Sequence, residues 1–225
     1  MLNTIQYDSN SEATSPSKII CIGRNYVDHI HELGNEVPSD MVVFLKPNSA
    51  ISTQLTSFHQ EPIHFETELC FSVRNGMFHG VGVGLDLTKR ELQSKLKSQQ
   101  LPWERAKAFD GSALFSDFVS LSSLSLTAGA TFCFQLTIDG EVRQLGHSYL
   151  MMYSADDILA SVNEFMTLVD GDIVMTGTPK GVGQVALGAV FEVKLWANVD
   201  YSSHVQLAEQ VSQIKPCIEH RWTAV

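Results

Sequence analysis

Three carboxylates have the residue type and spacing to hold a divalent cation. Glu66 and Glu68 are two residues apart in an alternating segment, 64–73, and a strand places such residues on one face, about 6.5–7 Å apart. Neighbouring carboxylates repel each other, and a hard cation such as Mg²⁺ removes that repulsion while keeping water ligands that a substrate can displace. Asp86, which follows the next apolar segment, is the natural third ligand. On spacing alone, two ordinary acids on a solvated strand face remain the alternative.

His29 and Glu32 form a second candidate group. They are three residues apart in a segment that we expect to be a short helix, capped by Asn25, running through His31 and followed by Gly34. Residues at this spacing share a helix face, and a carboxylate beside an imidazole is the arrangement of a general-base dyad. A surface pair without a catalytic role is the alternative.

Arg24, Arg90 and Lys107 are candidates for binding the carboxylate of a substrate. Lys107 lies between a tryptophan and a phenylalanine in PWERAKAFD, which indicates partial burial, and a desolvated lysine shifts its pKa readily. A surface lysine with a packed aliphatic stem is the alternative. The glycine-rich segment 176–183, TGTPKGVG, offers backbone N–H groups to an anion, although a tight turn also explains it. The absence of a GxSxG motif leaves a Ser-His-Asp hydrolase without support.

Short strands, with a few short helices between them, are expected to position these residues. Apolar or alternating runs predict strands, and Asp139-Gly140 predicts a type I′ hairpin turn. Apparent capping boxes begin helices at Thr88 and Ser154. We therefore expect a mainly β fold with a few short helices, of the α+β class, in one domain over 18–225 after a loose N-terminal extension, 1–17. The expected strand segments are 18–24, 41–47, 64–73, 77–87, 132–146 (as a hairpin), 172–179 and 190–199.

Composition narrows the classes of function. The chain has 225 residues and a formal net charge of −10, with no basic stripe, so we expect no nucleic-acid partner. No apolar run reaches the roughly 18 residues that a membrane span needs, and we expect no membrane partner. The first residues are polar and acidic and lack a signal-peptide pattern. Four scattered cysteines without metal-type spacing are expected to be reduced, buried and inert, which favours the cytoplasm.

Seven stretches, in order, resemble the fumarylacetoacetate hydrolase superfamily. The resemblance is strongest to its small single-domain members, such as acylpyruvases and 2-hydroxyhepta-2,4-diene-1,7-dioate isomerases. It implies a roll of mixed β-sheets like the C-terminal domain of that family, usually as a homodimer. The stretches are IGRNYVDHIHELG, VFLKP, HFETEL, GVGLDLTKRELQ, LPWERAKAFD, IDGEVRQLG and LVDGDIVMTGTPKGVG.

The resemblance also implies roles for particular residues. It implies metal ligands at Glu66, Glu68 and Asp86, with Mg²⁺ or Mn²⁺ as the cofactor. It implies a water-activating dyad of His29 and Glu32. Arg24 remains a substrate-site candidate from its residue type alone. The residues that the resemblance implies at the substrate site are Lys107, Arg90, Gln93, Gly177 and Thr178.

The function predicted from these features is hydrolysis of a C–C bond in a 3-acylpyruvate-like 2,4-dioxo acid. The substrate is a small 2-oxo acid that binds the metal, and His29 deprotonates a water molecule. Lys107 is the third catalytic candidate and would protonate or hold the carboxylate or oxyanion. Decarboxylation or tautomerisation of oxaloacetate, or isomerisation of an unsaturated hydroxy-diacid, uses the same metal site and remains open. The segment between Glu68 and Asp86 is shorter than in typical members of the family, which leaves the identity of the substrate undetermined.

Overall fold

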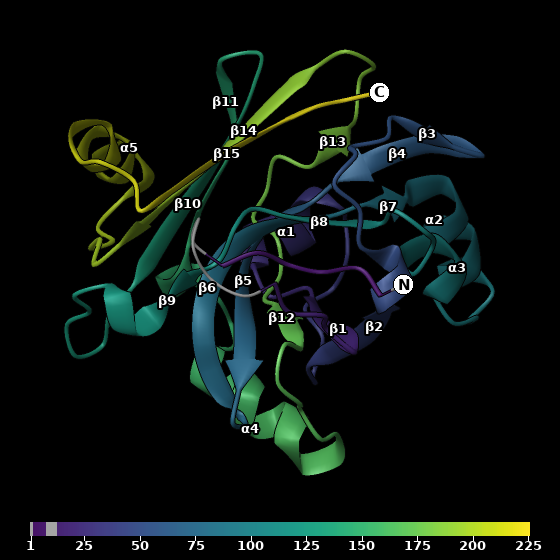
Figure 1. The fold of residues 1–225 in the computed structure, drawn as a ribbon. Helices are drawn as coiled ribbons and strands as arrows, with labels where there is room; N and C mark the ends of the chain where they lie inside the picture. Colours follow the sequence, from purple (N-terminus) through teal and green to yellow (C-terminus); the bar gives the residue numbers. More distant parts are fainter. Residues whose placement is uncertain (1, 8–12) are drawn as a thin grey trace.

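The structure is a computed structural model that describes residues 2–7 and 13–225. It is mainly β, with three sheets curled around a shared core and helices at the periphery (Figure 1). In the described residues the largest sheet has seven strands, in the order β2-β1-β12-β5-β6-β8 with β9 paired to β6. Its strands are β1 (Lys18–Gly23), β2 (Val42–Pro47), β5 (Thr67–Arg74), β6 (Met77–Asp86), β8 (Ala113–Phe115), β9 (Val119–Ser120) and β12 (Ile173–Met175).

Two smaller sheets complete the described fold. The first, in the order β11-β10-β14-β15, packs on the largest sheet, and Phe71 of β5 meets Phe132 of β10 edge-on with ring centroids 5.8 Å apart. The second places β13, β4 and β3 side by side, with β7 beside β4. The strands of the two sheets are β10 (Phe132–Ile138), β11 (Glu141–His147), β14 (Val190–Ala197), β15 (Ile218–Thr223), β3 (Phe58–His59), β4 (Glu61–Phe65), β7 (Thr88–Lys89) and β13 (Gly183–Gln184).

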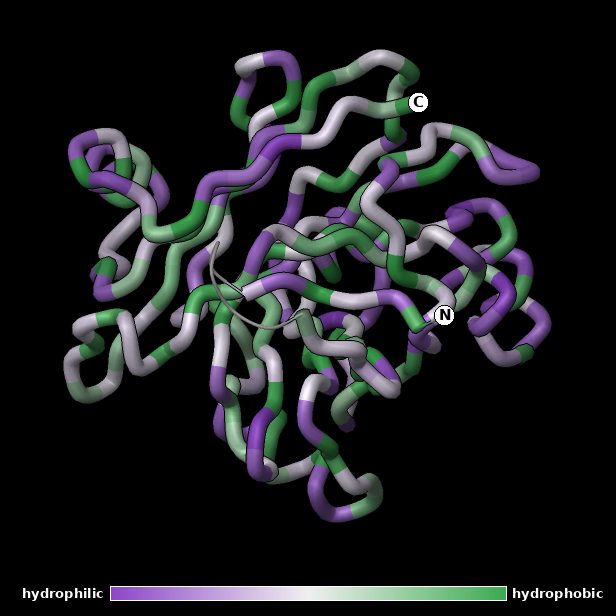
Figure 2. The backbone as a smooth tube through the Cα atoms, viewed as in Figure 1, coloured by the Kyte–Doolittle hydropathy of each residue, from purple (hydrophilic) through white to green (hydrophobic). Residues whose placement is uncertain are grey.

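The helices are short and peripheral. Hydrophobic residues recur along the central strands in Figure 2, whereas the edge helices mix hydrophilic and hydrophobic residues. Within the described ranges, no helix combines the length and apolar character that a membrane crossing requires. The helices are α1 (Val27–Glu32), α2 (Arg90–Ser98), α3 (Glu104–Lys107), α4 (Ala155–Phe165), α5 (His204–Gln213) and the 3₁₀ turns η1 (Asn48–Ala50), η2 (Leu121–Ser123) and η3 (Ser148–Leu150).

The strand predicted over 64–73 is divided at Glu66, because the chain passes there from one sheet to another. β4 ends at Phe65 in a small sheet, and β5 begins at Thr67 in the largest sheet. The Glu66 carbonyl accepts a 2.8 Å hydrogen bond from the Asp86 N–H. This bond fixes the end of β6 beside the break in the strand, and so it brings two of the predicted metal ligands together.

The glycines of β6 allow the close approach that the sequence predicted. A Cβ atom on Gly84 would lie 2.8 Å from Cys70 Sγ and 3.0 Å from the Leu114 carbonyl oxygen. Glycine is therefore the residue that lets β6 pack tightly between β5 and β8.

Two of the predicted helix caps are wrong, and one is confirmed. Ser154 caps α4 in a complete capping box. Neither α1 nor α2 has a side-chain cap. Asn25 instead donates to the carbonyls of Tyr153 and Thr176, and the Thr88 hydroxyl accepts from Lys107 Nζ. Both side chains have been drawn into tertiary contacts, which compete with local capping.

The N-terminal extension is not loose where the structure describes it. Ile5 and Tyr7 are buried, and the Tyr7 hydroxyl donates to Ser72 Oγ at 2.6 Å. Residues 1 and 8–12 of the predicted extension lie outside the described residues. Three of the cysteines are buried as expected, and burial raises the pKa of each of their thiols: Cys21, Cys70 and Cys133.

Candidate metal centre

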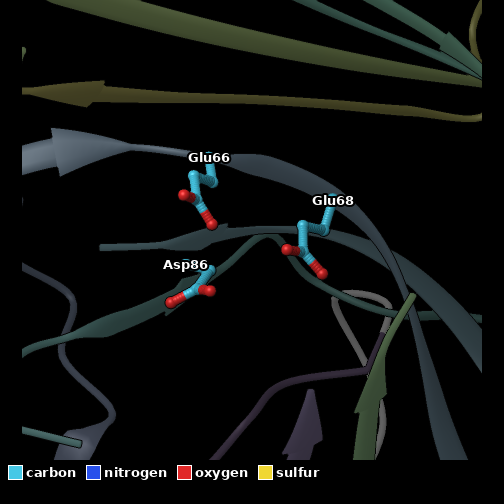
Figure 3. Close-up of side chains that lie close together, drawn as sticks. All are labelled: Glu66, Glu68 and Asp86. Carbon is cyan, nitrogen blue, oxygen red and sulfur yellow. The ribbon is translucent and has the colours of Figure 1, made fainter. Parts of the chain in front are cut away.

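Glu66, Glu68 and Asp86 converge on one point, as predicted. One oxygen from each carboxylate lies within 4.8 Å of the other two, and the three side chains face a common space in Figure 3. Their exposed fractions are 6%, 2% and 0%. A solvated strand face is therefore excluded, because all three acids are removed from water.

Three cations form ion pairs with two of these buried carboxylates, Glu66 and Asp86. Lys107 Nζ lies 2.7 Å from Glu66 Oε2 and 2.5 Å from Asp86 Oδ2. Arg90 forms an ion pair with Glu66 Oε1, and Lys46 Nζ lies 2.8 Å from Asp86 Oδ1. Lys46 is fully buried in β2, and nothing in its local sequence marked it as part of the site. Buried charges need such partners because desolvation disfavours an isolated ion.

The surroundings shift the pKa values of Glu66 and Glu68 in opposite directions. Burial alone raises the pKa of Glu66, but Lys107 and Arg90 outweigh it and hold the pKa well below 4.5. Burial also raises the pKa of Glu68, and repulsion from Asp86 and Glu66 adds to it, so the pKa stays well above 4.5. For Lys107, burial favours the neutral amine, but Asp86 and Glu66 reverse this and raise its pKa above 10.5.

The donor set fits a hard divalent cation. Asp86 Oδ1 is buried and receives no hydrogen bond from any described residue. Lys46, although close, directs its N–H groups to the carbonyls of Leu87, Lys107 and Ser112. That carboxylate oxygen therefore keeps lone pairs free. Three buried carboxylates whose oxygens lie within 4.8 Å of one another, one of them with an oxygen that accepts no hydrogen bond from the described residues, suit Mg²⁺ or Mn²⁺, which prefer oxygen ligands.

Lys107 has no N–H donor left over for a hydrogen bond to a substrate. An ammonium group carries three N–H donors, and those of Lys107 reach Glu66, Asp86 and the Thr88 hydroxyl. This geometry favours a role in positioning the carboxylates over the predicted direct contact with substrate.

His29 and Glu32 form the predicted pair on α1. His29 Nδ1 lies 3.1 Å from Glu32 Oε2, so a proton on Nδ1 leaves Nε2 as the basic nitrogen. The Gly181 N–H donates to both oxygens of Glu32, at 3.0 and 3.2 Å. The glycine-rich loop therefore holds the carboxylate that orients the imidazole, a link that the sequence did not reveal. His31 is exposed and takes no part.

One cavity unites most of the predicted residues. Glu32 and Gly177 do not line it, but each contacts a residue that does: Glu32 pairs with His29, and the Gly177 N–H donates to Glu68 at 2.7 Å. Phe44, Trp103 and Lys97 also line the cavity and were not predicted. The predicted residues that line it are Arg24, His29, Glu66, Glu68, Asp86, Arg90, Gln93, Lys107 and Thr178.

Gln144 is a further residue that sequence reasoning missed. Its side chain accepts from the Thr67 N–H at 3.0 Å and donates to Thr178 Oγ1 and the Pro179 carbonyl, both at 2.8 Å. It therefore ties β5 to the glycine-rich loop beside the cavity. Its position in the second strand of the predicted hairpin did not indicate this role, because its contacts are with segments far away in the sequence.

The chain is similar to known proteins over most of its length. The family described as fumarylacetoacetate (FAA) hydrolase C-terminal matches residues 18–214. The chain is 36% identical over 187 residues to oxaloacetate tautomerase YcgM of Escherichia coli, covering 76% of this chain and 85% of that protein. It is 34% identical over 206 residues to human mitochondrial oxaloacetate tautomerase FAHD1, covering 85% and 92%. With relatives named as mitochondrial, the cytoplasmic location stays a prediction.

A solved structure adds a metal to the comparison. Fumarylpyruvate hydrolase from Pseudomonas aeruginosa, in complex with Mn²⁺ and pyruvate, superimposes with a TM-score of 0.79 at 27% identity, covering 86% of this chain and 91% of that one. The predicted mainly β fold is thus confirmed by a relative with the same architecture.

Proposed function

The chain belongs to the fumarylacetoacetate hydrolase family, and from its site we propose that it is a divalent-metal-dependent oxaloacetate tautomerase, which interconverts the enol and keto forms. The observation that carries this proposal is one cavity lined both by three buried carboxylates and by His29. The curated relatives named as oxaloacetate tautomerases support it. They favour the alternative reaction over the acylpyruvate hydrolysis that the sequence predicted first.

Glu66, Glu68 and Asp86 would hold the cation, which we propose to be Mg²⁺ or Mn²⁺. When bound, it would polarise the 2-oxo group and stabilise the negative charge that develops on its oxygen. Arg90 is fixed by Glu66 and by Gln93, whose Oε1 accepts from it at 2.7 Å. These two side chains border the space where the 2-oxo acid would lie, and we assign them to its orientation.

His29 would move the protons. Conversion of the enol to the keto form removes one proton from the enol oxygen and adds one to C3, so one group that first accepts and then donates a proton is sufficient. An imidazole does both near neutral pH. Glu32 would stabilise the imidazolium between the two steps, and Gly181 would hold Glu32 in place. We assign Thr178, whose hydroxyl accepts from Gln144, to binding the carboxylate beside the 2-oxo group of the substrate.

Hydrolysis of an acylpyruvate is the second candidate. It is supported by the structural likeness to fumarylpyruvate hydrolase and by the same His29–Glu32 pair, which would then deprotonate a water molecule. The difference is mechanistic. Hydrolysis needs space for water beside His29, whereas tautomerisation needs only proton transfer within the bound acid.

The test is a rate measurement on freshly dissolved enol oxaloacetate, followed by the loss of enol absorbance. We expect Mg²⁺ or Mn²⁺ to accelerate conversion to the keto form, and we expect EDTA to remove the acceleration until metal is restored. A panel of acylpyruvates assayed beside it measures C–C cleavage. Rapid acylpyruvate cleavage without acceleration of the enol reaction would overturn the proposal in favour of hydrolysis.

A further inference from the structure

Two cations in the cavity have no carboxylate partner. Arg90 and Lys107 are ion-paired with the metal-ligand carboxylates. Arg24 and Lys97 line the same cavity, but neither forms an ion pair with a carboxylate of the described residues. In a chain with a formal net charge of −10, two uncompensated cations in one cavity are a specific arrangement rather than an average property of the surface.

The hydrogen bonds of Arg24 do not neutralise its positive charge. Its guanidinium donates to the neutral acceptors Asn35 Oδ1 at 3.2 Å and the Glu36 carbonyl at 3.5 Å. Its Nε is buried and has no hydrogen-bond partner among the described residues. A buried N–H without a hydrogen-bond partner is costly unless a ligand accepts from it.

Lys97 approaches the same space from α2. Its ammonium lies 4.7 Å from the centre of the Trp103 ring, which stabilises the cation, and both residues line the cavity. Burial, then the positive charges of Arg24 and Arg90, lower the pKa of Lys97 to about 8. The positive charges of Arg24, Arg90 and Lys97 therefore repel one another, and a bound anion would relieve this repulsion.

We propose that Arg24 and Lys97 bind the distal carboxylate of a 2-oxo dicarboxylic acid whose 2-oxo end lies at the carboxylate triad. The inference rests on the proposed function for the placement of the 2-oxo end. It adds the residues that recognise the second carboxylate of that substrate, so that short 2-oxo diacids are preferred over 2-oxo monoacids such as pyruvate through Arg24 and Lys97. Two charge-assisted hydrogen bonds from separate elements, the end of β1 and α2, give this preference its strength.

A binding experiment on the Mn²⁺-loaded protein tests the inference without turnover. The probes are difluorooxaloacetate, a diacid with no hydrogen on C3, and pyruvate, which lacks the distal carboxylate. Affinities are measured by calorimetry for the wild type, Lys97→Met, Arg24→Met and Lys97→Arg. Lys95→Met is the matched control, because Lys95 is exposed on the same helix.

We expect Lys97→Met and Arg24→Met each to weaken difluorooxaloacetate binding by about tenfold and pyruvate binding by less than about twofold. Lys97→Arg keeps the charge and is expected to retain most of the affinity, and Lys95→Met to change neither probe. Equal weakening of both probes, or of neither, by Lys97→Met would overturn the inference. Wild-type protein that prefers the diacid through Lys97 yet fails to convert enol oxaloacetate would instead overturn the proposed function and leave the inference standing.

Discussion

Six charged side chains form the centre of the site at the scale of single residues. Lys107, Lys46 and Arg90 form ion pairs with Glu66 and Asp86. Glu68 accepts a hydrogen bond from the Gly177 N–H. A divalent cation therefore joins a network that is already close to neutral. Its binding depends on Asp86 Oδ1, which has no hydrogen bond from the described residues. It also depends on compensating the burial of Glu68 and the repulsion of Glu68 by Asp86 and Glu66, which together raise the pKa of Glu68.

The imidazole of His29 is expected to be essential for proton transfer. His29→Ala removes the group that accepts and returns the proton, and loss of a general base typically lowers a rate by about 10²–10⁴-fold. Glu32→Gln should lower the rate in the same direction, because it removes the charge that stabilises the imidazolium. The measurement is kcat for enol oxaloacetate with saturating Mg²⁺, together with the Ki of oxalate, which should change little.

The control for this prediction lies on the same helix. His31 is exposed and two residues away, so His31→Ala should behave as the wild type. Near wild-type rates for both His29→Ala and Glu32→Gln would remove the pair from the mechanism and leave it as a structural contact.

The sequence was most informative about residues whose partners lie close in the chain or share a strand face. The spacing of Glu66 and Glu68, and of His29 and Glu32, predicted pairs that the structure brings together. Lys46 and Gln144 were not predicted as part of the site, because their contacts depend on how strands distant in the sequence pack together. A lysine in an apolar strand gives no local indication that it will reach an aspartate in β6.

The glycine-rich loop is the element that joins the two halves of the site. Gly177 donates to Glu68 and Gly181 donates to Glu32. Gly177 has φ of +103°, and a Cβ there would lie 2.8 Å from Asn25 Cβ and 3.1 Å from the Ile22 carbonyl oxygen. Side chains other than glycine rarely adopt this conformation, so the loop geometry depends on this residue.

Gly177→Ala is therefore expected to shift the loop and weaken Mn²⁺ binding by roughly tenfold, the usual effect of losing a partner that orients a metal ligand. Gly188→Ala is the matched control, because Gly188 also has a positive φ, +80°, but open space around it. It should lower stability slightly and leave Mn²⁺ affinity unchanged. Equal Mn²⁺ affinities in the two variants, measured by calorimetry, would contradict the role given to Gly177.

Asp172 anchors the parallel pair of β1 and β12. The buried carboxylate accepts from the backbone N–H groups of Ser17 and Lys18 and pairs with Lys18 Nζ at 2.5 Å. Burial alone raises the pKa of Asp172, but these contacts outweigh it and hold the pKa below 3.8. As the pH falls, the unfolded chain takes up a proton at Asp172 first. The stability from this group is thus complete above the ordinary pKa and is lost as the pH falls through the lower, folded-state pKa.

Asp172→Asn should lower the free energy of unfolding at pH 7 by about 2–3 kcal/mol, as expected for losing hydrogen bonds to a charged group. The difference from the wild type should shrink as the pH falls below 3.8, the ordinary pKa. Urea denaturation at neutral and acidic pH measures it. Asp170→Asn, at an exposed neighbouring position, serves as the control and should have little effect. A deficit that is constant with pH would contradict the assignment.

Turns and helix caps were predictable where residues close together in the sequence determine them. The Asp139-Gly140 turn has both residues at positive φ, as its type requires, and Ser154 caps α4. The caps predicted at Asn25 and Thr88 failed, because tertiary partners recruited the same polar groups. The single strand predicted over 64–73 failed at Glu66, since alternation of side chains continues across a change of sheet.

At the scale of the whole molecule, the resemblance that predicts this family also predicts a homodimer. Met77 and Tyr149 are largely exposed at an apolar hollow lined by Phe71, Phe78 and Met151, a surface that we propose is covered by a second copy. Light scattering should give a mass of about twice the chain mass of 24.9 kDa at micromolar concentration. A mass of one chain under those conditions would contradict the homodimer.

Whether the buried carboxylates form a metal centre or only a neutralised cluster is the central question for the whole site. Calorimetric titration of metal-free protein with Mn²⁺ tests it most directly, with wild type compared with Glu68→Gln and Asp86→Asn. We predict one Mn²⁺ per wild-type chain, bound more tightly when oxalate is present, and affinities reduced by more than about 100-fold in both variants. Wild-type protein that binds no Mn²⁺, or variants that bind it equally well, would contradict the account.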